Sequence, residues 1–419
     1  MKINADKIIR LLGCSILLIF SYWLLIPTGS NSLTGSNAIL NTSDGAVHIP
    51  SSGEILEEGY EMYDSIDENS GYKYKLVKPA VYTGEKEKAC FVTLARNSDL
   101  YGLLKAIQSV EDRFNKKFQY DWVFLNDEEF NDEFKRLTSA LISGETKYGL
   151  VPKEHWSYPD FIDLDKAAAS RKKLGDDGIL YGYSEPYRFM CRYESGLFFK
   201  HPLMDEYDWY WRVEPDVEFF CDVDFDVFKF MRDNNKKYAF TVSIFEYIGT
   251  IPTLWNTTME FFNEHPEYLH PNNMMDFVSD DDGFSYNLCH YWSNFEIASL
   301  DFYRSEAYTK YFEYLDQSGG FFYERWGDAP VHSIAVSLLM DRSEIHHFDQ
   351  IAYYHPPFYS CSVDDETRIK NKCSCDPAND FTWQGYSCTG RYYKINNLEK
   401  PDGWFESVSY THLTLPTKA

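Results

Sequence analysis

The residues best placed to do chemistry follow a short apolar strand that ends in carboxylates. Residues 208–216 read Asp-Trp-Tyr-Trp-Arg-Val-Glu-Pro-Asp. Proline lacks an amide hydrogen and fixes its own φ, so the backbone must leave the sheet where Glu214 and Asp216 emerge. Ligands bind where such strands end. A carboxylate at this point is either a ligand for a divalent cation or a plain turn former, and its position alone does not decide between the two.

The acidity continues beyond this turn, with six carboxylates from Glu214 to Asp226 and only Arg212 as a close basic neighbour. Apolar residues at helical spacing follow, and Asp222 or Asp224 is predicted to cap that helix and favour its dipole. Asp222-Val223-Asp224 also matches a metal-binding DxD pattern. We favour the helix cap for these two residues, and for Glu214 the spacing leaves a metal ligand and a turn former equally open.

Size and charge limit the classes of function. The chain has 419 residues, of which 44% are hydrophobic and 18% aromatic, so it can bury a large core. Its formal charge of −25 opposes nucleic acid as a partner, because a phosphate backbone requires clustered lysine and arginine. An anionic substrate would need a bound metal or a few convergent arginines.

The N-terminus predicts a membrane anchor. Residues 1–7 form a predicted cytoplasmic tail, and residues 8–27 are a near-continuous apolar segment of about the length that a bilayer requires. No small-residue cleavage signal follows, so an uncleaved signal-anchor is expected. The basic flank predicts a cytoplasmic N-terminus and therefore a single-pass, type II topology, with the rest of the chain in the secretory lumen.

Three further segments follow the anchor. Residues 28–87 are rich in Ser, Asn, Gly and Glu and are predicted to be a flexible stem. Residues 88–406 are predicted to form the folded domain. Residues 407–419 read like translated adaptor sequence and are expected to lie outside the native fold.

The cysteines agree with an oxidising lumen. Eight lie outside the apolar segment, and this even number permits four disulfides. A zinc site is the alternative, but the spacing is not that of a zinc ribbon or finger. The pairing cannot be deduced from the sequence. The eight are Cys90, Cys191, Cys221, Cys289, Cys361, Cys373, Cys375 and Cys388.

The order of apolar runs predicts an α/β fold. Short β-branched and aromatic runs indicate buried strands at 89–95, 122–125, 209–213 and 238–245, and residues 100–114 have helical spacing. Alternation of strands and helices indicates one sheet with crossover helices.

The ends of these strands predict one edge of the sheet that bears polar residues. Ligands bind outside the carboxyl ends of such strands. The residues expected along that edge are Arg96, Asn97, Asn126, Asp127 and Glu214.

The C-terminal half adds three predicted elements. Residues 293–300 form a strand that carries Glu296. Ser305 caps a helix that Gly319 and Gly320 end. Residues 327–332 begin another helix, whose early proline and anion-friendly N-terminus are typical of helix starts.

Several ordered motifs together resemble the fungal Golgi α-1,2-mannosyltransferases of glycosyltransferase family 15. The likeness extends over about residues 88–404. The motifs are Tyr210-Trp211-Arg212-Val213-Glu214-Pro215, Ser184-Glu185-Pro186-Tyr187-Arg188-Phe189-Met190-Cys191-Arg192-Tyr193, Ser293-Asn294-Phe295-Glu296, Gly327-Asp328-Ala329-Pro330-Val331-His332 and Tyr354-His355-Pro356-Pro357-Phe358.

The resemblance implies a single large lumenal domain with a GT-A-type mixed sheet flanked by helices, in the Golgi membrane. It implies GDP-mannose as the donor, Mn²⁺ as the cofactor, retention of the α configuration, and a terminal mannose of an N-linked or O-linked glycan as the acceptor. By the same resemblance, Glu214 is the metal carboxylate, His355 is the metal histidine, and Glu296 is the proposed nucleophile. A carboxylate, an imidazole and two phosphate oxygens form a reasonable shell for Mn²⁺.

The resemblance also implies the residues that bind nucleotide and substrate. Arg96 is expected to approach the nucleotide, and Tyr187 to supply a hydroxyl in the substrate pocket. Asp216 is placed with this group, and Asp328 is either a helix cap or a contact to an acceptor hydroxyl.

Each role has an ordinary structural alternative. A strand glutamate such as Glu296 is usually solvated, a lone loop histidine such as His355 is rarely a ligand, and Tyr187 alone is an ordinary aromatic. The rival histidines are His332, His346 and His347. Only the motif context favours the catalytic interpretation.

Two other functions remain open. A protein of this fold that binds glycans without turnover is one, and a metal-dependent glycosidase is the other. The sequence also leaves open whether retention proceeds by double displacement or by same-face attack.

Overall fold

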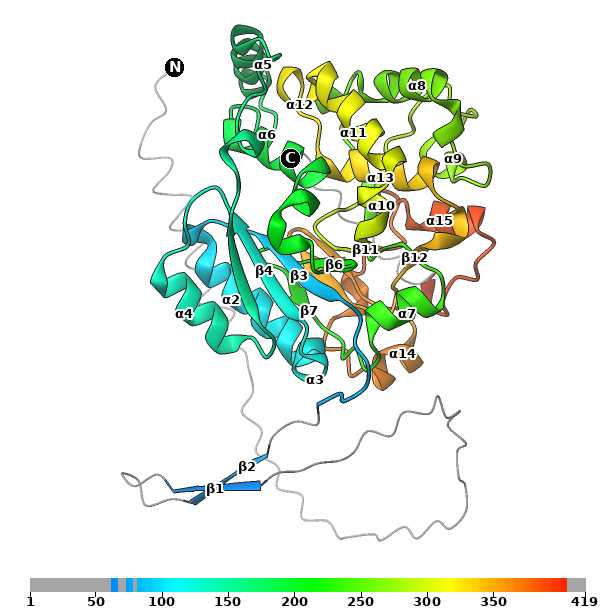
Figure 1. Cartoon of the computed structure of the whole chain (residues 1–419). Coiled ribbons are helices and arrows are strands. Elements are labelled where there is room, and N and C mark those ends of the chain that lie inside the picture. The colour runs from blue at the N-terminus through cyan, green and yellow to red at the C-terminus, as the bar shows by residue number, and fades with distance from the viewer. Residues whose placement is uncertain (1–61, 67–72, 78–80, 405–419) are drawn as a thin grey trace, which may run out of the picture. The chain divides into compact units, whose positions relative to one another are not determined.

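The computed structural model describes residues 62–66, 73–77 and 81–404 (Figure 1). The predicted anchor at 8–27 and the predicted tail at 407–419 lie outside these ranges. Within them, none of the helices combines the length and the apolar character needed to cross a bilayer.

A seven-stranded sheet in the order β12-β8-β11-β6-β3-β4-β5 forms the centre of the folded domain. Strand β11 is antiparallel to both of its neighbours, β6 and β8, and the other pairs of neighbouring strands are parallel. The sheet is therefore mixed, as predicted. Its strands are β3 (Ala89–Leu94), β4 (Asp121–Asn126), β5 (Thr146–Leu150), β6 (Trp209–Arg212), β8 (Tyr238–Phe240), β11 (Glu296–Ser299) and β12 (Ile345–His347).

Both faces of this sheet are buried. Along β3, Ala89 and Phe91 face one core while Cys90 and Val92 face the other, because side chains alternate across a strand. Parallel strands buried on both faces read as continuous apolar runs, which is the pattern that the sequence shows. Complete burial of a side chain such as Phe91 contributes about 3 kcal/mol.

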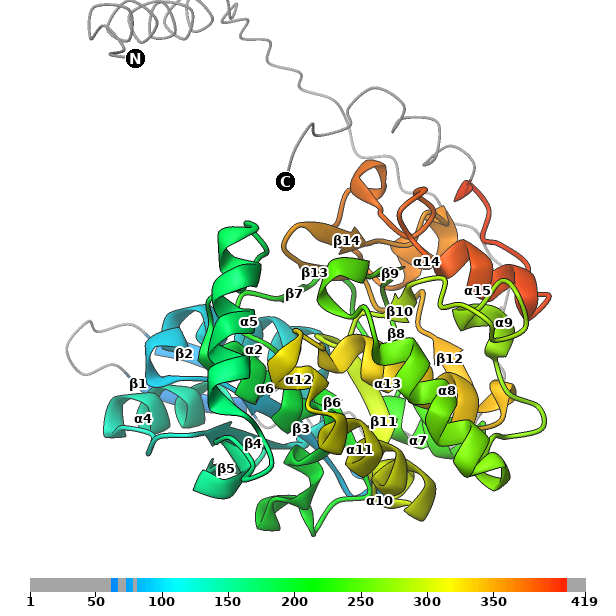
Figure 2. The ribbon, with the colours of Figure 1, turned by 90° about the horizontal axis from the view of Figure 1, so that it is seen from above.

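Helices cover each face. The core on one side includes residues of α2, α4 and α7, and the core on the other includes residues of α5, α6, α8, α10, α11 and α13. Figure 2 shows α8, α11 and α13 grouped together, and α11 contacts both of the others. The helices are α2 (Leu100–Val110), α3 (Lys116–Phe118), α4 (Asp132–Leu141), α5 (Leu164–Asp176), α6 (Glu185–Gly196), α7 (Val227–Asp233), α8 (Leu254–Glu264), α9 (Met275–Val278), α10 (Leu300–Arg304), α11 (Glu306–Ser318), α12 (Gly320–Tyr323), α13 (Asp328–Leu339), α14 (Asp365–Lys370) and α15 (Thr389–Ile395).

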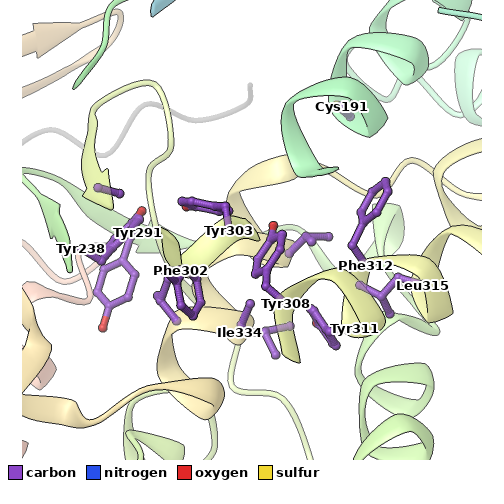
Figure 3. Close-up of a cluster of buried hydrophobic side chains, with 14 of the residues drawn as sticks. Cys191, Tyr238, Tyr291, Phe302, Tyr303, Tyr308, Tyr311, Phe312, Leu315 and Ile334 are labelled. Atoms are coloured by element: carbon purple, nitrogen blue, oxygen red, sulfur yellow. The ribbon is translucent and has the colours of Figure 1, made fainter. Parts of the chain in front are cut away.

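The second of these cores is rich in tyrosine. Figure 3 shows Tyr238 close to Tyr291 and Tyr303 close to Tyr308, with ring centroids 5.4 Å and 4.7 Å apart. Buried tyrosine hydroxyls need hydrogen-bond partners. This core therefore places tyrosine hydroxyls beneath the sheet edge. The carboxylate of Glu296 is buried in the same place.

Three smaller sheets complete the fold. One is a three-stranded sheet in the order β14-β13-β7, the second pairs β9 with β10, and the third pairs β1 with β2. The pair β1–β2 falls within the predicted stem at 28–87, where no strands were predicted. The strands are β1 (Met62–Ile66), β2 (Lys73–Val77), β7 (Glu218–Phe219), β9 (Ser243–Phe245), β10 (Cys289–Tyr291), β13 (Tyr353–His355) and β14 (Phe358–Ser360).

The prediction of a cap by Asp222 or Asp224 was wrong. Helix α7 begins later, and Asp226 accepts the amide hydrogens of Phe228 and Lys229. The earlier two aspartates instead pair with basic residues of the segment after α2. Arg113 lies 2.8 Å from Asp222, and Lys117 lies 3.4 Å from Asp224.

Two predicted helices of the C-terminal half are confirmed. Ser305 accepts the amide hydrogen of Tyr308 at the start of α11, and Gly319 ends that helix at φ 77°. That conformation favours glycine because a side chain would be strained there. Helix α13 begins at Asp328, as the sequence predicted. The predicted strand at 238–245, by contrast, divides into β8 and β9, which belong to different sheets.

The described cysteines form three disulfides rather than the four that the count permits. The bonds join Cys221 to Cys373, Cys289 to Cys388 and Cys361 to Cys375. Cys90 on β3 and Cys191 on α6 are buried thiols on the same core. The first two bonds fasten the C-terminal segment to the domain, and the third closes a loop within that segment beyond β14.

Candidate active site

The polar residues predicted along one sheet edge do lie there. Strands β6, β3 and β4 are parallel neighbours, so Glu214, Arg96 and Asp127 all follow carboxyl ends at the same edge. Figure 1 shows these three strands side by side.

Arg212, the last residue of β6, organises the acidic side chains of this edge. Its guanidinium is buried, and it donates to Asp328 Oδ2 at 2.6 Å and to Glu214 Oε1 at 2.5 Å. Glu194 Oε2 lies 3.8 Å away. Burial by itself would lower the pKa of Arg212, but the carboxylates, Glu194 and Asp328 first, raise it well above its ordinary value.

Glu214 remains ionised because of these neighbours. Burial alone would raise the pKa of its carboxyl group, but Arg212 and then His355 outweigh burial and hold that pKa at about 2. The side chain keeps 28% of its surface exposed, so one oxygen can reach a ligand while the other binds Arg212. The structure thus supplies an anion that is fixed and accessible.

His355 approaches Glu214 from a different sheet. It ends β13, and its Nε2 lies 3.5 Å from Glu214 Oε2. Its Nδ1–H donates to the carbonyl oxygen of Pro356 at 3.0 Å, so a neutral imidazole would carry its lone pair on Nε2. The ring of Trp292 packs against the imidazole, with centroids 4.7 Å apart.

This arrangement fits a cation between Glu214 and His355. A proton on Nε2 or a bound cation can link the imidazole to the carboxylate, and a ligating histidine commonly donates its other N–H to a carbonyl. Oxygen and imidazole donors suit Mn²⁺. Over the described residues no cluster of three or more His, Cys, Asp or Glu side chains is suited to hold a metal, so further ligands would come from substrate and water.

Asp216 does not belong to α2 but packs against the first turn of that helix. Its φ is 62°, and its carboxylate lies against Gly102, where an added Cβ would come within 2.5 Å of Oδ1. A side chain at position 102 would require the exposed carboxylate of Asp216 to move. Asp216 is exposed, and its assignment to substrate or nucleotide stays a prediction.

Glu296 is buried more deeply than expected for a residue that meets a substrate. It has no exposed surface, and its carboxylate accepts hydrogen bonds from Tyr210 at 2.8 Å and Tyr238 at 2.9 Å. His332 Nδ1 lies 2.8 Å from the same carboxylate. In register Glu296 opposes Arg212, so it faces the same side of the sheet one strand away. Its role as nucleophile stays a prediction.

His332 belongs to this buried network and not to the metal pair. Its Nε2 lies 3.1 Å from the carbonyl oxygen of Glu194, which can only accept, so Nε2 carries a proton and Nδ1 shares a proton with Glu296. Burial lowers the pKa of His332, but the Glu296 carboxylate outweighs burial and raises it. The other rival histidines lie elsewhere: His346 packs against Phe230, and His347 hydrogen-bonds Tyr393.

Asp328 is held from two sides. Its Oδ2 accepts from Arg212 and, at 2.7 Å, from the hydroxyl of Ser293. The side chain is 8% exposed, and the residue is the first of α13. The structure therefore shows a carboxylate fixed by an arginine and a serine, beyond the helix start that the sequence predicted.

Tyr187 and Arg96 are more accessible. Tyr187 is half-buried on α6, stacks on Tyr181 with centroids 4.5 Å apart, and has Arg325 over its ring at 5.1 Å. Arg96 leaves 74% of its side chain exposed while it pairs with Asp99 at 3.1 Å. Both can meet a ligand, and their predicted roles are neither supported nor opposed by these contacts.

Sequence reasoning missed Glu194 and the central part played by Arg212. Tyr187, Cys191 and Glu194 recur at helical spacing on α6, so this spacing could have placed Glu194 on the face that bears Tyr187. Ser293 was quoted in a motif without a role. No periodicity indicates that Arg212 turns into the domain, because that depends in part on Glu194 and Asp328, which come from distant segments.

Comparison with known proteins identifies the family. Residues 58–397 match the sequence profile of the family described as "Glycolipid 2-alpha-mannosyltransferase". The chain belongs to this family. The predicted resemblance to glycosyltransferase family 15 is therefore confirmed.

The relatives cover most of the chain. It is 66% identical to "Alpha-1,2 mannosyltransferase KTR1" of Saccharomyces cerevisiae over 339 residues, which are 81% of this chain and 86% of that protein. It is 55% identical to "Glycolipid 2-alpha-mannosyltransferase 1" of Candida albicans, over 90% of this chain and 83% of that protein.

A solved family member carries the ligands that the resemblance implies. The crystal structure of core-mannan synthase A from Aspergillus fumigatus, in its Mn/GDP form, matches with a TM-score of 0.71 and 41% identity. The match covers 77% of this chain and 88% of that one. The predicted GT-A-type architecture thus agrees with a family member of known structure.

The burial of Glu194 predicts a dependence of stability on pH. Burial, opposed by Arg212, raises the pKa of Glu194 from 4.5 to about 7. The folded state then binds a proton more tightly than the unfolded state, so the free energy of unfolding falls as pH rises from 4.5 to 7, by roughly 3 kcal/mol. Denaturant unfolding of Glu194→Gln should lack this contribution.

Glu129→Gln, at an exposed position, is the matched control and should keep the wild-type pH dependence. Identical pH dependence for wild type and Glu194→Gln would contradict the assigned protonation.

Proposed function

We propose that this protein is a Mn²⁺-dependent retaining α-1,2-mannosyltransferase that moves mannose from GDP-mannose to a terminal α-mannose of N-linked or O-linked glycans. Membership of the family and the names of its relatives support the reaction. The observation that carries the proposal is the meeting of Glu214 and His355 at the sheet edge. The donor set is suited to Mn²⁺, and a family member of 41% identity has been crystallised with Mn and GDP.

The local charge explains why a cation is required. Glu194, Glu214 and Asp328 surround a single guanidinium, so the edge cannot accept a diphosphate without added positive charge. Mn²⁺ held by Glu214 and His355 would offset the charge that develops on departing GDP. Arg212 keeps Glu214 ionised and oriented for that task.

The transfer breaks the bond between mannose C1 and the phosphate oxygen, and forms a bond from C1 to the acceptor 2-hydroxyl oxygen. The acceptor proton leaves with the diphosphate or passes to a carboxylate. We assign Glu296 to the face opposite the leaving group, where it would attack C1 or stabilise positive charge on the sugar. Its hydrogen bonds to Tyr210, Tyr238 and His332 fix its position.

The names of the relatives suggest the class of acceptor. One relative, 55% identical over 76% of this chain, is named "O-glycoside alpha-1,2-mannosyltransferase omh1" of Schizosaccharomyces pombe. Other relatives are named for glycolipid transfer. We favour protein-linked glycans as acceptors. Comparing a protein-linked glycan with a glycolipid in the transfer assay would decide between the two classes.

Transfer should require both donor and metal. The purified full chain is expected to extend an α-mannoside by one mannose in the presence of GDP-mannose and Mn²⁺, and to lose this activity after chelation. Mass spectrometry of the product checks the prediction. Free mannose as the product would indicate a glycosidase, and bound glycan without any extension would indicate a binding protein.

Glu296→Gln should separate binding from turnover. We expect it to lose transfer by at least about 100-fold, because the amide cannot act as an anion at C1, while calorimetry shows GDP binding like that of wild type. Tyr238→Phe, which removes one donor but keeps the carboxylate, should retain most activity. Full turnover by a folded Glu296→Gln would remove this residue from the mechanism.

We also propose a Golgi location with residues 8–27 as a type II signal-anchor. The three disulfides support an oxidising compartment. In sealed Golgi vesicles the catalytic domain should resist protease until detergent is added. Digestion without detergent would place the domain on the cytoplasmic side.

A further inference from the structure

The helix that carries Tyr187 also carries a buried arginine without a counter-ion. Arg188 on α6 has no exposed surface. Its Nη1 donates to the carbonyl oxygen of Ser184 at 2.7 Å and lies 3.5 Å from that of Tyr181. Its Nε and Nη2 have no hydrogen-bond partner among the described residues, and no ion pair joins it to a described carboxylate. Buried charges in proteins are normally paired, so this guanidinium points to a ligand that the described chain does not supply.

Arg192, one helical turn further along α6, shows what such a guanidinium binds. Its Nε and Nη2 donate to the two carboxylate oxygens of Asp316, at 2.7 and 2.8 Å. The N–H bonds of these two nitrogens point the same way and match two oxygens of one anion. The same two nitrogens are the unpartnered ones in Arg188. The free side of Arg188 therefore has the geometry of an oxyanion site.

The charged groups around Arg188 add to its positive charge. Burial, and then Arg171 and Arg325, lower the pKa of Arg188 to about 10. Arg171 of α5 is matched by Glu185, which lies 3.2 Å away. Arg325 lies over the ring of Tyr187 at 5.1 Å and makes no ion pair with a described residue, and its buried Nε has no hydrogen-bond partner there. Two guanidinium charges thus remain uncompensated in this part of the chain.

The arginine cluster, Arg171, Arg188 and Arg325, lies where three segments meet. Helix α12 contacts both α5 and α6, and Arg325 follows α12 by two residues. Figure 1 shows α5 and α12 side by side. Arg188 shares one face of α6 with Arg192, whereas Glu194, which approaches Arg212, lies on another face. The cluster is therefore separate from the proposed metal pair.

The charge of the cluster favours phosphate as the ligand. Phosphate carries up to two negative charges near neutral pH, which match the two uncompensated guanidinium groups. Two of its oxygens suit the free side of Arg188, and a third is available to Arg325. Water could accept both hydrogen bonds of Arg188 but would leave its charge buried and unpaired.

We propose that Arg188 and Arg325 form a binding site for phosphate, with Arg171 at its rim. Free phosphate and a phosphate monoester on a sugar share this chemistry, and the complete burial of Arg188 favours the smaller free ion. The bound ion joins the start of α6, and with it the helical turn of Tyr187, to the segment after α12. The site needs neither the nucleotide nor the metal of the proposed transfer reaction.

Calorimetric titration of the purified full chain with inorganic phosphate tests the site. Mn²⁺ and nucleotide are left out, and chloride keeps the ionic strength constant. Wild type should bind one phosphate. Arg188→Lys can still donate to the carbonyl oxygen of Ser184 but loses the paired donors, so it should bind phosphate about tenfold or more weakly.

Two further variants complete the set. Arg325→Gln, at a partly exposed position without an ion pair among the described residues, should fold normally and also weaken phosphate by about tenfold. Arg136→Lys, at an exposed position on α4, is the matched control and should bind phosphate as wild type does.

The possible outcomes separate this site from the proposed metal pair. Phosphate binding that requires Mn²⁺ would place the ion at Glu214 and overturn the assignment. Wild-type affinity in both Arg188→Lys and Arg325→Gln, or no binding of millimolar phosphate by folded wild type, would also overturn it. Tighter binding of mannose 6-phosphate than of free phosphate, lost in the same two variants, would support the arginine site and identify a sugar phosphate as its ligand.

Discussion

The site depends on one buried guanidinium placed among carboxylates. Arg212 turns into the domain at the end of β6 and pairs with Glu214 and Asp328, while Glu194 lies just beyond direct contact. A buried carboxylate without such a partner would become protonated or would move toward water. Arg212 therefore holds the carboxylates at this sheet edge in place. One of them is Glu214, which we propose as a ligand of the metal.

The same pairing explains how an acidic protein can use an anionic donor. The chain carries a formal charge of −25, and the charge of Arg212 is already taken by acidic neighbours. The cation that we propose at Glu214 and His355 would attract the diphosphate locally without a basic surface. The tyrosine-rich core also helps to form the site, because the hydroxyls of Tyr210 and Tyr238 hold Glu296 beneath the same sheet edge.

The positions of several strands and of their ends could be predicted from the sequence because both depend on local pattern. The apolar runs of β3, β4 and β6 located Arg96, Asp127 and Glu214 correctly at one edge. His355 could be joined to Glu214 only through the family resemblance, because its strand belongs to another sheet. The resemblance also located Glu296, but not its complete burial.

Other features follow from long-range packing that no local pattern reveals. Asp226 and not Asp222 caps α7, because Asp222 is drawn to Arg113 of a distant segment. Cys90 and Cys191 are buried thiols in the core that also holds the bonded pair Cys289–Cys388, so burial and spacing in the sequence do not reveal which cysteines pair. Glu194 lies one residue past the motif that was recognised, and its importance appears only when α6 packs against Arg212.

The most direct measurement is the anomalous scattering of manganese in crystals of this protein soaked with Mn²⁺ and GDP. The account predicts one strong peak within bonding distance of both Glu214 Oε2 and His355 Nε2, with diphosphate density beside it. A peak at Asp222 and Asp224, or diphosphate bound with no metal at Glu214, would contradict it.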